Sequence, residues 1–541
     1  MKTKKTAEFG DFQTPDGLAW EVCQLLAASG IKPAALLEPT CGLGAFLFSA
    51  LDTFESATKA MGVEINADYI KEAKATLGQR RDAERVEVAH KDFFVTDWAK
   101  VVAALPEPLL IIGNLPWVTN ADLGALGSRN LPTKSNFQKR NGFDAVTGKA
   151  NFDISEWMLI RLLEAMNGRR GTLAILCKAS VARKALYHGW KSSLSLERSA
   201  IYRINAALHF NAAVEAVLLV THFEPGARDW KANVFPRLYI RDKPIIIGYQ
   251  DDMLLANFTA YHKWKHLCGV ERIRWRSGVK HDCSTVMEVR REGKRFRNGL
   301  GEVVELEDAY IYPMLKSSDL ANGRVNNESR WMIVTQTAVG AATTGIKKSA
   351  PRTWAYLNAH AELLNKRRSS IYKNRPAFCI FGIGDYSFAP WKVAISGFYK
   401  RLVFITIGPC HNKPVVLDDT CYFLPCQTKQ QADYLVELLN SSAAQAFYNA
   451  FVFWDTKRPI TAELLRRLDL RTLAAQLGST KVFDAYFGGV AADSLTRSVG
   501  VATARKKGMH RKSLSPTLWS EEEVPDTGAR ADDAKTSTFH P

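Results

Sequence analysis

The stretch from Leu36 to Leu47 constrains the fold most, because it combines a short apolar run, a tight turn and the start of a helix. Glu38 ends the apolar run, Gly42 and Gly44 form a Gly-x-Gly turn, and apolar residues then recur at helical spacing. This pattern is typical of the first strand, loop and helix of a doubly wound α/β sheet. The glycines would let the backbone approach a nucleoside-like ligand at the polarised helix end.

Two further acidic residues follow strand-like segments. Glu64 lies near the end of the apolar segment 60–65, about 20 residues after the glycine turn, and Asp92 follows the segment 86–90. The carboxyl ends of parallel strands share one edge of a sheet, and ligands bind there. We therefore expect Glu38, Glu64 and Asp92 to lie at one ligand site, with Glu64 within reach of ribose hydroxyls.

A fourth apolar strand, residues 111–113, runs directly into Asn114, Leu115, Pro116 and Trp117. The side-chain carbonyl of Asn114 can accept hydrogen bonds from an exocyclic amino group, and the ring of Trp117 offers a face on which a base can stack. An ordinary strand-to-loop turn is the alternative for this segment taken alone. The three acidic residues upstream favour a ligand-binding role.

Together these segments resemble the gamma class of S-adenosylmethionine-dependent DNA amino-methyltransferases, in which the cofactor motifs precede a carboxyl-terminal target recognition domain. The resemblance covers about the first 225 residues in order and spacing. Phe12 to Pro15 is similar to the family's opening motif, Glu38 to Gly44 to its Asp-Pro-x-Cys-Gly-x-Gly loop, and Asn114 to Trp117 to its Asn-Pro-Pro-aromatic catalytic motif. The resemblance implies that S-adenosyl-L-methionine is bound by Phe12, Thr14, Pro15, Glu38, Pro39, Cys41, Gly42, Gly44, Glu64, Asp92, Phe93 and Asn114.

Leu115 departs from the family, which usually has proline there. The resemblance assigns this position a backbone carbonyl as second acceptor for the target amine, and every residue type carries one, so we expect the chemistry to survive. The departure brings the motif closer to the Asn-Leu-Pro-Tyr of ribosomal RNA adenine dimethyltransferases. A resemblance to those enzymes implies a short chain with a small helical extension. Over 300 residues follow the methyltransferase-like region here, which favours DNA as the substrate.

The expected chemistry follows from the amine. Its lone pair is delocalised into the base, so Asn114 and the Leu115 carbonyl would draw its hydrogens toward tetrahedral geometry for direct transfer, with no metal required. The base must leave the duplex, and Trp117 would form one wall of its pocket. Phe210, in a segment that matches a late family motif, is the best candidate for the other wall, ahead of Tyr187 and Tyr202. A core aromatic at a strand edge is the alternative for Phe210.

We expect a site-specific DNA (adenine-N6)-methyltransferase, the modification enzyme of a restriction-modification system. Methylation of the 4-amino group of cytosine is an alternative, because the same acceptor pair could serve it. An alternative of another class is a catalytically inactive nucleic-acid-binding protein with a methyltransferase fold. The methylase motifs begin within fifteen residues of Met1, so any cleavage is expected from a separate endonuclease.

Composition agrees with a DNA-associated protein of the cytoplasm. The 541 residues carry a formal charge of +17, which suits a polyanionic partner, and contain no apolar run of membrane-spanning length and no secretory signal. Nine scattered cysteines indicate reduced thiols. Two patterns are weighed as decoys: Pro425-Cys426-Gln427 imitates the nucleophile of cytosine carbon-5 methyltransferases, and Cys410, His411, Cys421 and Cys426 imitate zinc ligands without matching a zinc-site spacing.

The sequence predicts an α/β, Rossmann-like doubly wound methyltransferase sheet in residues 1–228, a mixed α+β target recognition domain in residues 229–492 and a disordered tail in residues 493–541. The polar stretch 119–151, which includes Lys134, is expected to close over the base and its phosphates. Polar and aromatic segments at 275–282, 312–319 and 382–392 resemble recognition loops. The candidate DNA contacts there are Trp275, Lys316, Tyr386 and Lys392, and the basic runs 366–368 and 373–375 are candidates for phosphates.

Overall fold

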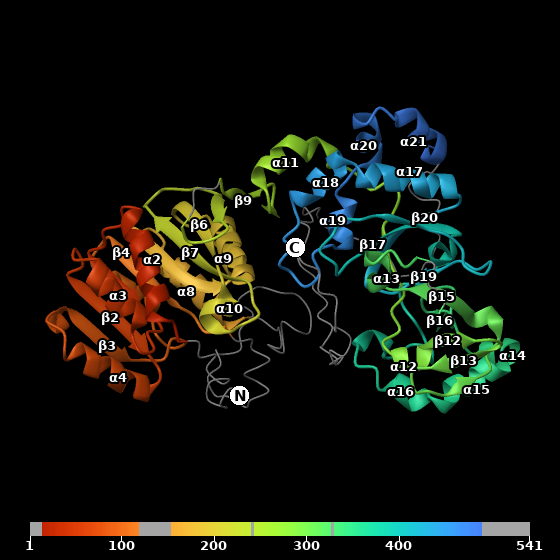
Figure 1. The fold of residues 1–541 in the computed structure, drawn as a ribbon, viewed down its shortest axis with the longest axis horizontal. Helices are drawn as coiled ribbons and strands as arrows, with labels where there is room; N and C mark the ends of the chain where they lie inside the picture. Colours follow the sequence, from red (N-terminus) through yellow and green to blue (C-terminus); the bar gives the residue numbers. More distant parts are fainter. Residues whose placement is uncertain (1–12, 118–152, 240–242, 326–328, 489–541) are drawn as a thin grey trace, which may run out of the picture. The chain divides into compact units, whose positions relative to one another are not determined.

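A computed structural model describes residues 13–117, 153–239, 243–325 and 329–488 (Figure 1). The amino-terminal half is built on a ten-stranded sheet with the strand order β10-β9-β8-β6-β7-β5-β4-β1-β2-β3. Its strands are β1 (Ala35–Glu38), β2 (Lys59–Glu64), β3 (Val86–His90), β4 (Leu109–Asn114), β5 (Gly171–Lys178), β6 (Leu196–Ile204), β7 (Ala216–Phe223), β8 (Lys231–Phe235), β9 (Ile245–Gln250) and β10 (Met253–Leu255).

Helices cover both faces of this sheet, because its central strands are apolar on both sides. In β1, Ala35 and Leu37 join one buried cluster while Leu36 joins the other, as expected for side chains that alternate along a strand. The first cluster includes residues of α5 (Trp98–Ala103), α8 (Ile154–Met166) and α9 (Ala179–Lys191). The second includes residues of α2 (Asp16–Ala28), α3 (Ala45–Thr53), α4 (Ala67–Leu77) and α10 (Ala206–Phe210). The predicted doubly wound α/β class is confirmed.

Strand β1 occupies the position where ligands bind in such sheets. It pairs in parallel with β2 on one side and with β4 on the other, so the strand order reverses at this point. Strand β3 continues the parallel set beyond β2. The carboxyl ends of β4, β1, β2 and β3 therefore lie next to one another along a single edge, which positions the predicted site.

The sheet extends past residue 228, where the sequence pattern suggested a domain boundary. Strand β8 pairs in parallel with β6, and β9 and β10 add two more strands by antiparallel pairing. The chain then leaves the sheet, and the N–H groups of Ala256 and Asn257 donate to the carbonyl of Ala450 at 2.8 and 3.1 Å. Residues 231–255 are therefore continuous with the first sheet.

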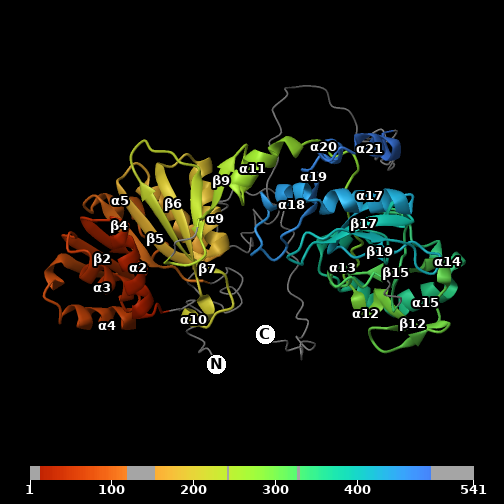
Figure 2. The same cartoon turned by 45° about the horizontal axis from the view of Figure 1, so that its top comes forward.

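The carboxyl-terminal half has two smaller sheets, of order β11-β20-β17-β18 and β14-β13-β12-β16-β15-β19. Helix α17 packs against β17 (Figure 2). The strands are β11 (Arg276–Ser277), β12 (Glu288–Glu292), β13 (Arg295–Asn298), β14 (Val303–Val304), β15 (Ile311–Leu315), β16 (Arg330–Ile333), β17 (Trp391–Ser396), β18 (Ile405–Ile407), β19 (Val416–Leu417) and β20 (Cys421–Cys426). The helices are α11 (Phe258–Trp264), α12 (Ser284–Met287), α13 (Ser317–Ala321), α14 (Ile346–Ser349), α15 (Pro351–Ala359), α16 (Ala361–Asn365), α17 (Lys429–Asn440), α18 (Ser442–Asn449), α19 (Ala462–Arg466), α20 (Leu470–Gln476) and α21 (Thr480–Phe487).

Arg183 of α9 forms an ion pair of 2.6 Å with Asp455, and the two side chains are only 11% and 10% exposed. The Arg183 guanidinium also lies 4.5 Å from the centre of the Phe453 ring. Such a shielded pair is screened little by salt. The predicted tail, residues 493–541, lies outside the described residues. Among the described helices, none has the length and apolar character needed to cross a bilayer.

Candidate active site

The glycine loop between β1 and α3 is shaped by two residues with positive φ, Gly42 at +51° and Gly44 at +92°. A Cβ atom on Gly42 would lie 2.7 Å from Gln13 Oε1, and one on Gly44 would lie 2.5 Å from the ring of Phe48. The Leu43 N–H also donates to Gln13 Oε1 at 3.5 Å. The loop lies close to the side chains of Gln13 and Phe48. Only glycine therefore fits both positions without strain.

The two carboxylates beside this loop have different surroundings. Glu64, at the end of β2, is half-buried and accepts hydrogen bonds from the N–H groups of Gly42 (2.9 Å), Ile65 (2.9 Å) and Asn66 (2.8 Å). Glu38 is 3% exposed and accepts from the Leu47 N–H at 2.8 Å. Burial raises the pKa of Glu38 well above its ordinary value. Glu38 therefore binds the first turn of α3 from the protein interior. Glu64 binds the backbone of the glycine loop at the carboxyl end of β2.

Asp92 follows β3 and is half-buried, with its Oδ1 accepting a hydrogen bond from the Phe94 N–H at 2.8 Å. The neighbouring Phe93 is 5% exposed, and its ring centre lies 4.5 Å from that of Trp98. The ring of Phe94 lies 5.4 Å from that of Trp157 on α8. Asp92 thus stands at the sheet edge beside an aromatic cluster, in which Phe93 is a core residue.

The remaining predicted cofactor residues surround this loop. Cys41 is 4% exposed, and its N–H donates to the Val63 carbonyl at 2.8 Å, which joins the loop to β2. Burial raises the pKa of the Cys41 thiol, as expected for a small packing residue. Pro39 is buried, Thr14 is half-buried, and Pro15 immediately precedes α2. Phe12 lies outside the described residues.

Asn114 is the last residue of β4, beside the loop that follows β1. Its backbone carbonyl accepts a hydrogen bond from Thr40 Oγ1 at 3.1 Å, which ties the two strand ends together. The Leu115 N–H donates to the Leu176 carbonyl at 3.4 Å, and the Leu115 side chain is 1% exposed. The predicted catalytic motif therefore begins at the end of a sheet strand rather than in a free loop.

Trp117 and Phe210 meet edge to face, with ring centres 4.8 Å apart and an interplanar angle of 66°. Phe210 ends the short helix α10, which begins with the Asn205 side chain accepting from the Leu208 N–H at 3.1 Å. The other candidate rings have different neighbours. Tyr202 stacks on Phe235 with ring centres 4.9 Å apart, and Tyr187 contacts Tyr249. Of the three candidates, Phe210 is the one that contacts Trp117.

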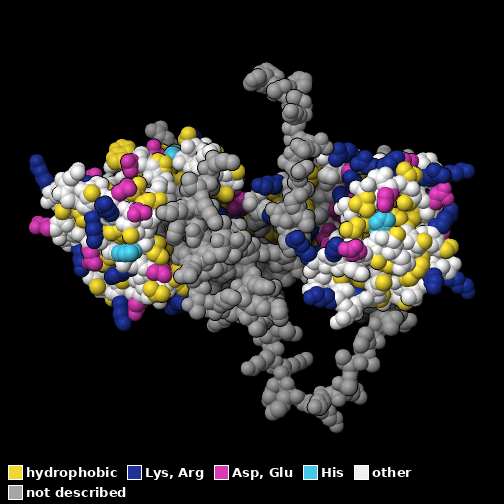
Figure 3. All heavy atoms as spheres, turned by 90° about the horizontal axis from the view of Figure 1, so that it is seen from below, with side chains coloured by type: hydrophobic (Ala, Val, Ile, Leu, Met, Phe, Trp, Pro, Cys, Tyr) yellow, Lys and Arg dark blue, Asp and Glu magenta, His cyan; other side chains and the backbone are white. Residues whose placement is uncertain are grey.

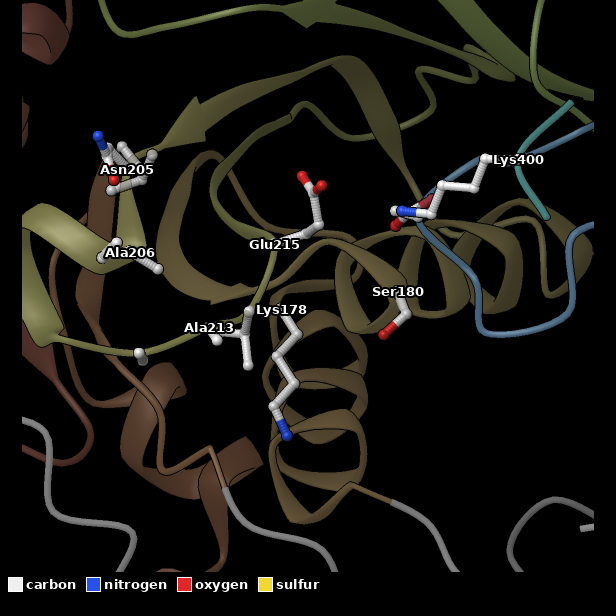
Figure 4. A pocket seen from close by; sticks show the side chains of 12 residues that line it. Lys178, Ser180, Asn205, Ala206, Ala213, Glu215 and Lys400 are labelled. Atoms are coloured by element: carbon white, nitrogen blue, oxygen red, sulfur yellow. The ribbon is translucent and has the colours of Figure 1, made fainter. Parts of the chain in front are cut away.

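A hollow of about 590 Å³ adjoins this edge. Lys178, the last residue of β5, lines it next to β4, where Leu176 pairs with Asn114 (Figure 4). Figure 4 shows Lys178 and Glu215 extending in opposite directions, with Lys400 from the carboxyl-terminal half at another side of the hollow. Lys178 forms an ion pair with Asp153, at the start of α8. Sequence reasoning missed Lys178, although its position at a strand end matches that of the predicted acidic residues.

Two predicted DNA contacts are corrected by the structure. Trp275 and Lys392 are each 1% exposed, so neither can meet a base or a phosphate at the surface. Trp275 packs within a hydrophobic core, and Lys392 Nζ donates to the Ala389 carbonyl at 2.6 Å. Burial lowers the pKa of Lys392 to about 7.

The other predicted contacts have mixed surroundings. Lys316 is partly exposed and pairs with Glu288 at 2.6 Å, and Tyr386 lies under the guanidinium of Arg276. In the basic run 366–368, Arg367 donates to the Cys379 carbonyl at 2.8 Å, which indicates a structural role. Lys134 lies outside the described residues.

The decoy motifs have no geometry that supports them. Cys426 is 2% exposed, and burial raises the pKa of its thiol to about 12, which opposes a nucleophilic thiolate. No group of three or more potential metal ligands occurs within the described ranges.

No family model matches the chain. It is, however, 44% identical over 472 residues to the Type II methyltransferase M.NspV of Nostoc sp. (strain ATCC 29411 / PCC 7524), a match that covers 87% of this chain and 98% of the relative. The chain belongs to the Type II methyltransferases. This Type II methyltransferase is a restriction-modification DNA methyltransferase, as its sequence predicted.

A solved structure supports the fold of this Type II methyltransferase. The Type IIL restriction-modification enzyme MmeI, in complex with DNA, matches with a TM-score of 0.51 and 15% identity, covering 92% of this chain and 74% of that chain. A putative class I S-adenosylmethionine-dependent methyltransferase from Listeria monocytogenes matches with a TM-score of 0.30 and 17% identity, covering 42% of this chain and 67% of that chain.

The cofactor of this Type II methyltransferase is S-adenosylmethionine. The residues present fit it, because both loop glycines lack the side chain that would fill the approach to the backbone. Two half-buried carboxylates, Glu64 and Asp92, stand at neighbouring strand ends, where they can accept hydrogen bonds from hydroxyl or amino groups.

Proposed function

We propose that this enzyme methylates the 6-amino group of an adenine flipped out of duplex DNA, at a specific sequence. The observation that carries the proposal is the placement of Asn114 at the end of β4, directly beside the β1 loop and its carboxylates. A methyl donor held over the loop and an amine held by Asn114 would meet at this edge. The likeness of residues 114–117 to the family's catalytic motif supports the same assignment.

In this mechanism the protein acts by positioning. The side-chain carbonyl of Asn114 and the backbone carbonyl of Leu115 would accept hydrogen bonds from the two N–H groups of the amine and so orient the nitrogen lone pair for transfer. The new nitrogen–carbon bond replaces the sulfur–carbon bond of the donor, which leaves as a thioether, and the nitrogen gives up one proton to solvent. Bound S-adenosylmethionine supplies an electrophilic methyl on sulfur, so neither a metal ion nor a covalent enzyme intermediate is needed. The rigid attachment of Leu115 to β5 favours such precise placement, because the Leu115 N–H is bonded to the Leu176 carbonyl.

Flipping the base requires a change at Trp117 and Phe210. Atoms in contact lie about 3.5–4.0 Å apart, so a base stacked between two rings needs them roughly 7 Å apart. The ring centres of Trp117 and Phe210 are 4.8 Å apart. We infer that the target base displaces Phe210 from Trp117 and takes its place against the indole face.

Duplex DNA as the partner is supported by charge and by the kind of protein that shares the fold. The chain carries a formal charge of +17, and Lys and Arg side chains are seen at many points on the face shown in Figure 3. MmeI, which shares the fold over most of this chain, was solved with DNA. A separate restriction endonuclease would complete the system.

The test is identification of the methylated product. Purified enzyme is incubated with S-adenosylmethionine carrying a labelled methyl group and with mixed-sequence duplex DNA, and the DNA is digested to nucleosides for mass spectrometry. N6-methyldeoxyadenosine confined to one sequence context is expected, and Asn114→Ala serves as the control. Labelled N4-methyldeoxycytidine would replace adenine by cytosine as the target, and cofactor binding without any labelled nucleoside would indicate an inactive binding protein.

A further inference from the structure

An arginine row precedes and begins β11. Within residues 272–276, Ile273 and Trp275 are 7% and 1% exposed and point into the core. Arg274 and Arg276 flank Trp275 in the extended stretch that leads into β11, so their side chains share the side opposite the core, because successive side chains alternate along an extended segment. Arg272 lies at the bend just before this stretch, and we call the three residues the arginine row. Arg272 and Arg274 are exposed, and Arg276 is partly exposed.

Few acidic groups balance this row. Glu271 is engaged by Arg466, with Nε and Oε1 3.4 Å apart, and also accepts from the Trp275 N–H. Asp469 lies 3.7 Å from Arg272. Neither Arg274 nor Arg276 forms an ion pair with any carboxylate in the part of the chain that the structure describes. Burial, and next to it the charge of Arg274, lower the pKa of Arg276, so these two like charges act on each other.

Tyr386, in the short 3-10 helix Asp385–Phe388, supports one member of the row. The Cζ atom of Arg276 lies 4.3 Å from the centre of the Tyr386 ring. This ring lies so close to its own loop that a Cβ atom on Gly384 would be 2.5 Å from Tyr386 Cε1. A guanidinium over a held aromatic face keeps its edge N–H groups available to an acceptor. Tyr386 thus acts as a positioning residue for Arg276.

We propose that the arginine row binds the phosphate backbone of duplex DNA, with Arg274 and Arg276 each contacting a phosphate group. The inference rests on the proposed function, since it assumes that DNA is the substrate. The charge of the row carries it: Arg274 and Arg276 act on each other as like charges, neither is in an ion pair with a carboxylate among the described residues, and a polyanion relieves their repulsion. Arginine also matches phosphate geometry with two parallel N–H donors.

The test measures DNA affinity as a function of salt. Wild type, Arg274→Gln and Arg276→Gln are titrated with a duplex that contains the mapped methylation site and with an unrelated duplex, between about 50 and 200 mM salt. Arg290→Gln is the matched control, because Arg290 is an exposed arginine of β12 on a different sheet and has no ion pair within the described residues. Melting temperature and cofactor affinity check the fold of each variant.

Each row variant should weaken binding to both duplexes and reduce the slope of log affinity against log salt by about 0.9. Arg290→Gln should change neither. Tyr386→Ala should reproduce part of the Arg276→Gln loss, and Tyr386→Phe, which keeps the ring, should restore it. Unchanged slopes in the row variants, an equal loss in Arg290→Gln, or a loss confined to the cognate duplex would each overturn the inference.

Failure of this inference differs from failure of the proposed function. If wild type binds and methylates duplex DNA while the row variants match it, the row alone is refuted. If wild type binds no duplex, both proposals fall together.

Discussion

The indole of Trp117 packs edge to face against the ring of Phe210, with the ring centres 4.8 Å apart. Phe210 is 9% exposed and Trp117 is 6% exposed. Each ring shields the other from water, so the surface that we propose for the target base is covered in this structure. Binding of a base should therefore replace the contact between Trp117 and Phe210 with a contact between Trp117 and the base. The free energy of the ring-to-ring contact is lost when the contact with the base forms.

Trp117→Ala should leave cofactor affinity unchanged and reduce methyl transfer to duplex DNA by about tenfold or more, because stacking on an aromatic ring contributes roughly 1–3 kcal/mol per base. Isothermal titration with the cofactor and single-turnover transfer to a duplex with the mapped site measure the two effects. Tyr202→Ala is the aromatic control, since Tyr202 stacks on Phe235 instead. Equal losses in both variants would remove the assigned role of Trp117.

Asn114→Ala should lower turnover by about two orders of magnitude or more while the fold is kept and cofactor binding stays nearly intact, because one of two amine acceptors is lost. Asn114→Asp keeps an acceptor oxygen and should retain more activity than the alanine variant. Labelled methyl transfer at saturating DNA is the measurement. Wild-type turnover in Asn114→Ala would refute the acceptor role.

Leu115→Pro separates the chemistry of the motif from its packing. The carbonyl at this position remains, so transfer per folded molecule should be largely retained. Stability should fall, because the substitution removes the N–H that donates to Leu176 and reduces a side chain that is 1% exposed; each loss contributes about 1 kcal/mol or more. Urea denaturation monitors stability. A stable but inactive Leu115→Pro enzyme would show that the motif has been misinterpreted.

Glu64→Ala and Asp92→Ala should both weaken S-adenosylmethionine binding, by about 1–3 kcal/mol, because each removes a directional acceptor. Glu64→Ala should also loosen the glycine loop, since three backbone N–H groups lose their partner. Isothermal titration reports affinity, and proteolysis near the loop reports its order. Normal cofactor binding by Asp92→Ala would refute the placement of that carboxylate.

Lys392→Met should stabilise the protein, and the gain should depend on pH. Burial lowers the pKa of Lys392 from 10.5 to about 7, so between these values the unfolded chain binds a proton that the folded chain does not. Wild-type stability from this group therefore falls as pH drops from 10.5 to 7 and is level below 7. The advantage of the methionine variant should be a few kcal/mol at pH 7 and shrink toward pH 10, as measured by urea denaturation. A gap that does not change with pH would contradict the buried-charge explanation.

Much of the cofactor half could be predicted from sequence, because its elements are strongly patterned and local. The strand expected at residues 86–90 is β3, Val86–His90, and the helix expected after the Gly-x-Gly turn is α3, Ala45–Thr53. The adjacency of Glu38, Glu64, Asp92 and Asn114 followed from the rule that parallel strands share an edge. The roles of these residues in binding and transfer stay predictions.

The predictions that failed concern residues whose burial or pairing depends on contacts between segments far apart in the sequence. The aromatic character of Trp275 favours a surface contact with a base, whereas the alternation of apolar Ile273 and Trp275 with arginines favours burial, and the structure buries both apolar residues. Lys392 could not be placed, because its burial depends on the strand pairing around it and on the Ala389 carbonyl. Strand β8 escaped prediction because its partner, β6, is reached only through tertiary pairing.

The extension of the first sheet to Leu255 has a practical meaning for hybrid enzymes. If the carboxyl-terminal half selects the DNA sequence, exchanging it between related enzymes at residue 228 would cut away three strands that belong to the catalytic sheet. A junction after Asn257 preserves them, provided that the donor half supplies a carbonyl equivalent to that of Ala450 and an acid equivalent to Asp455 opposite Arg183. Grafts built on that junction should inherit a new target sequence while keeping an intact methyl-transfer site.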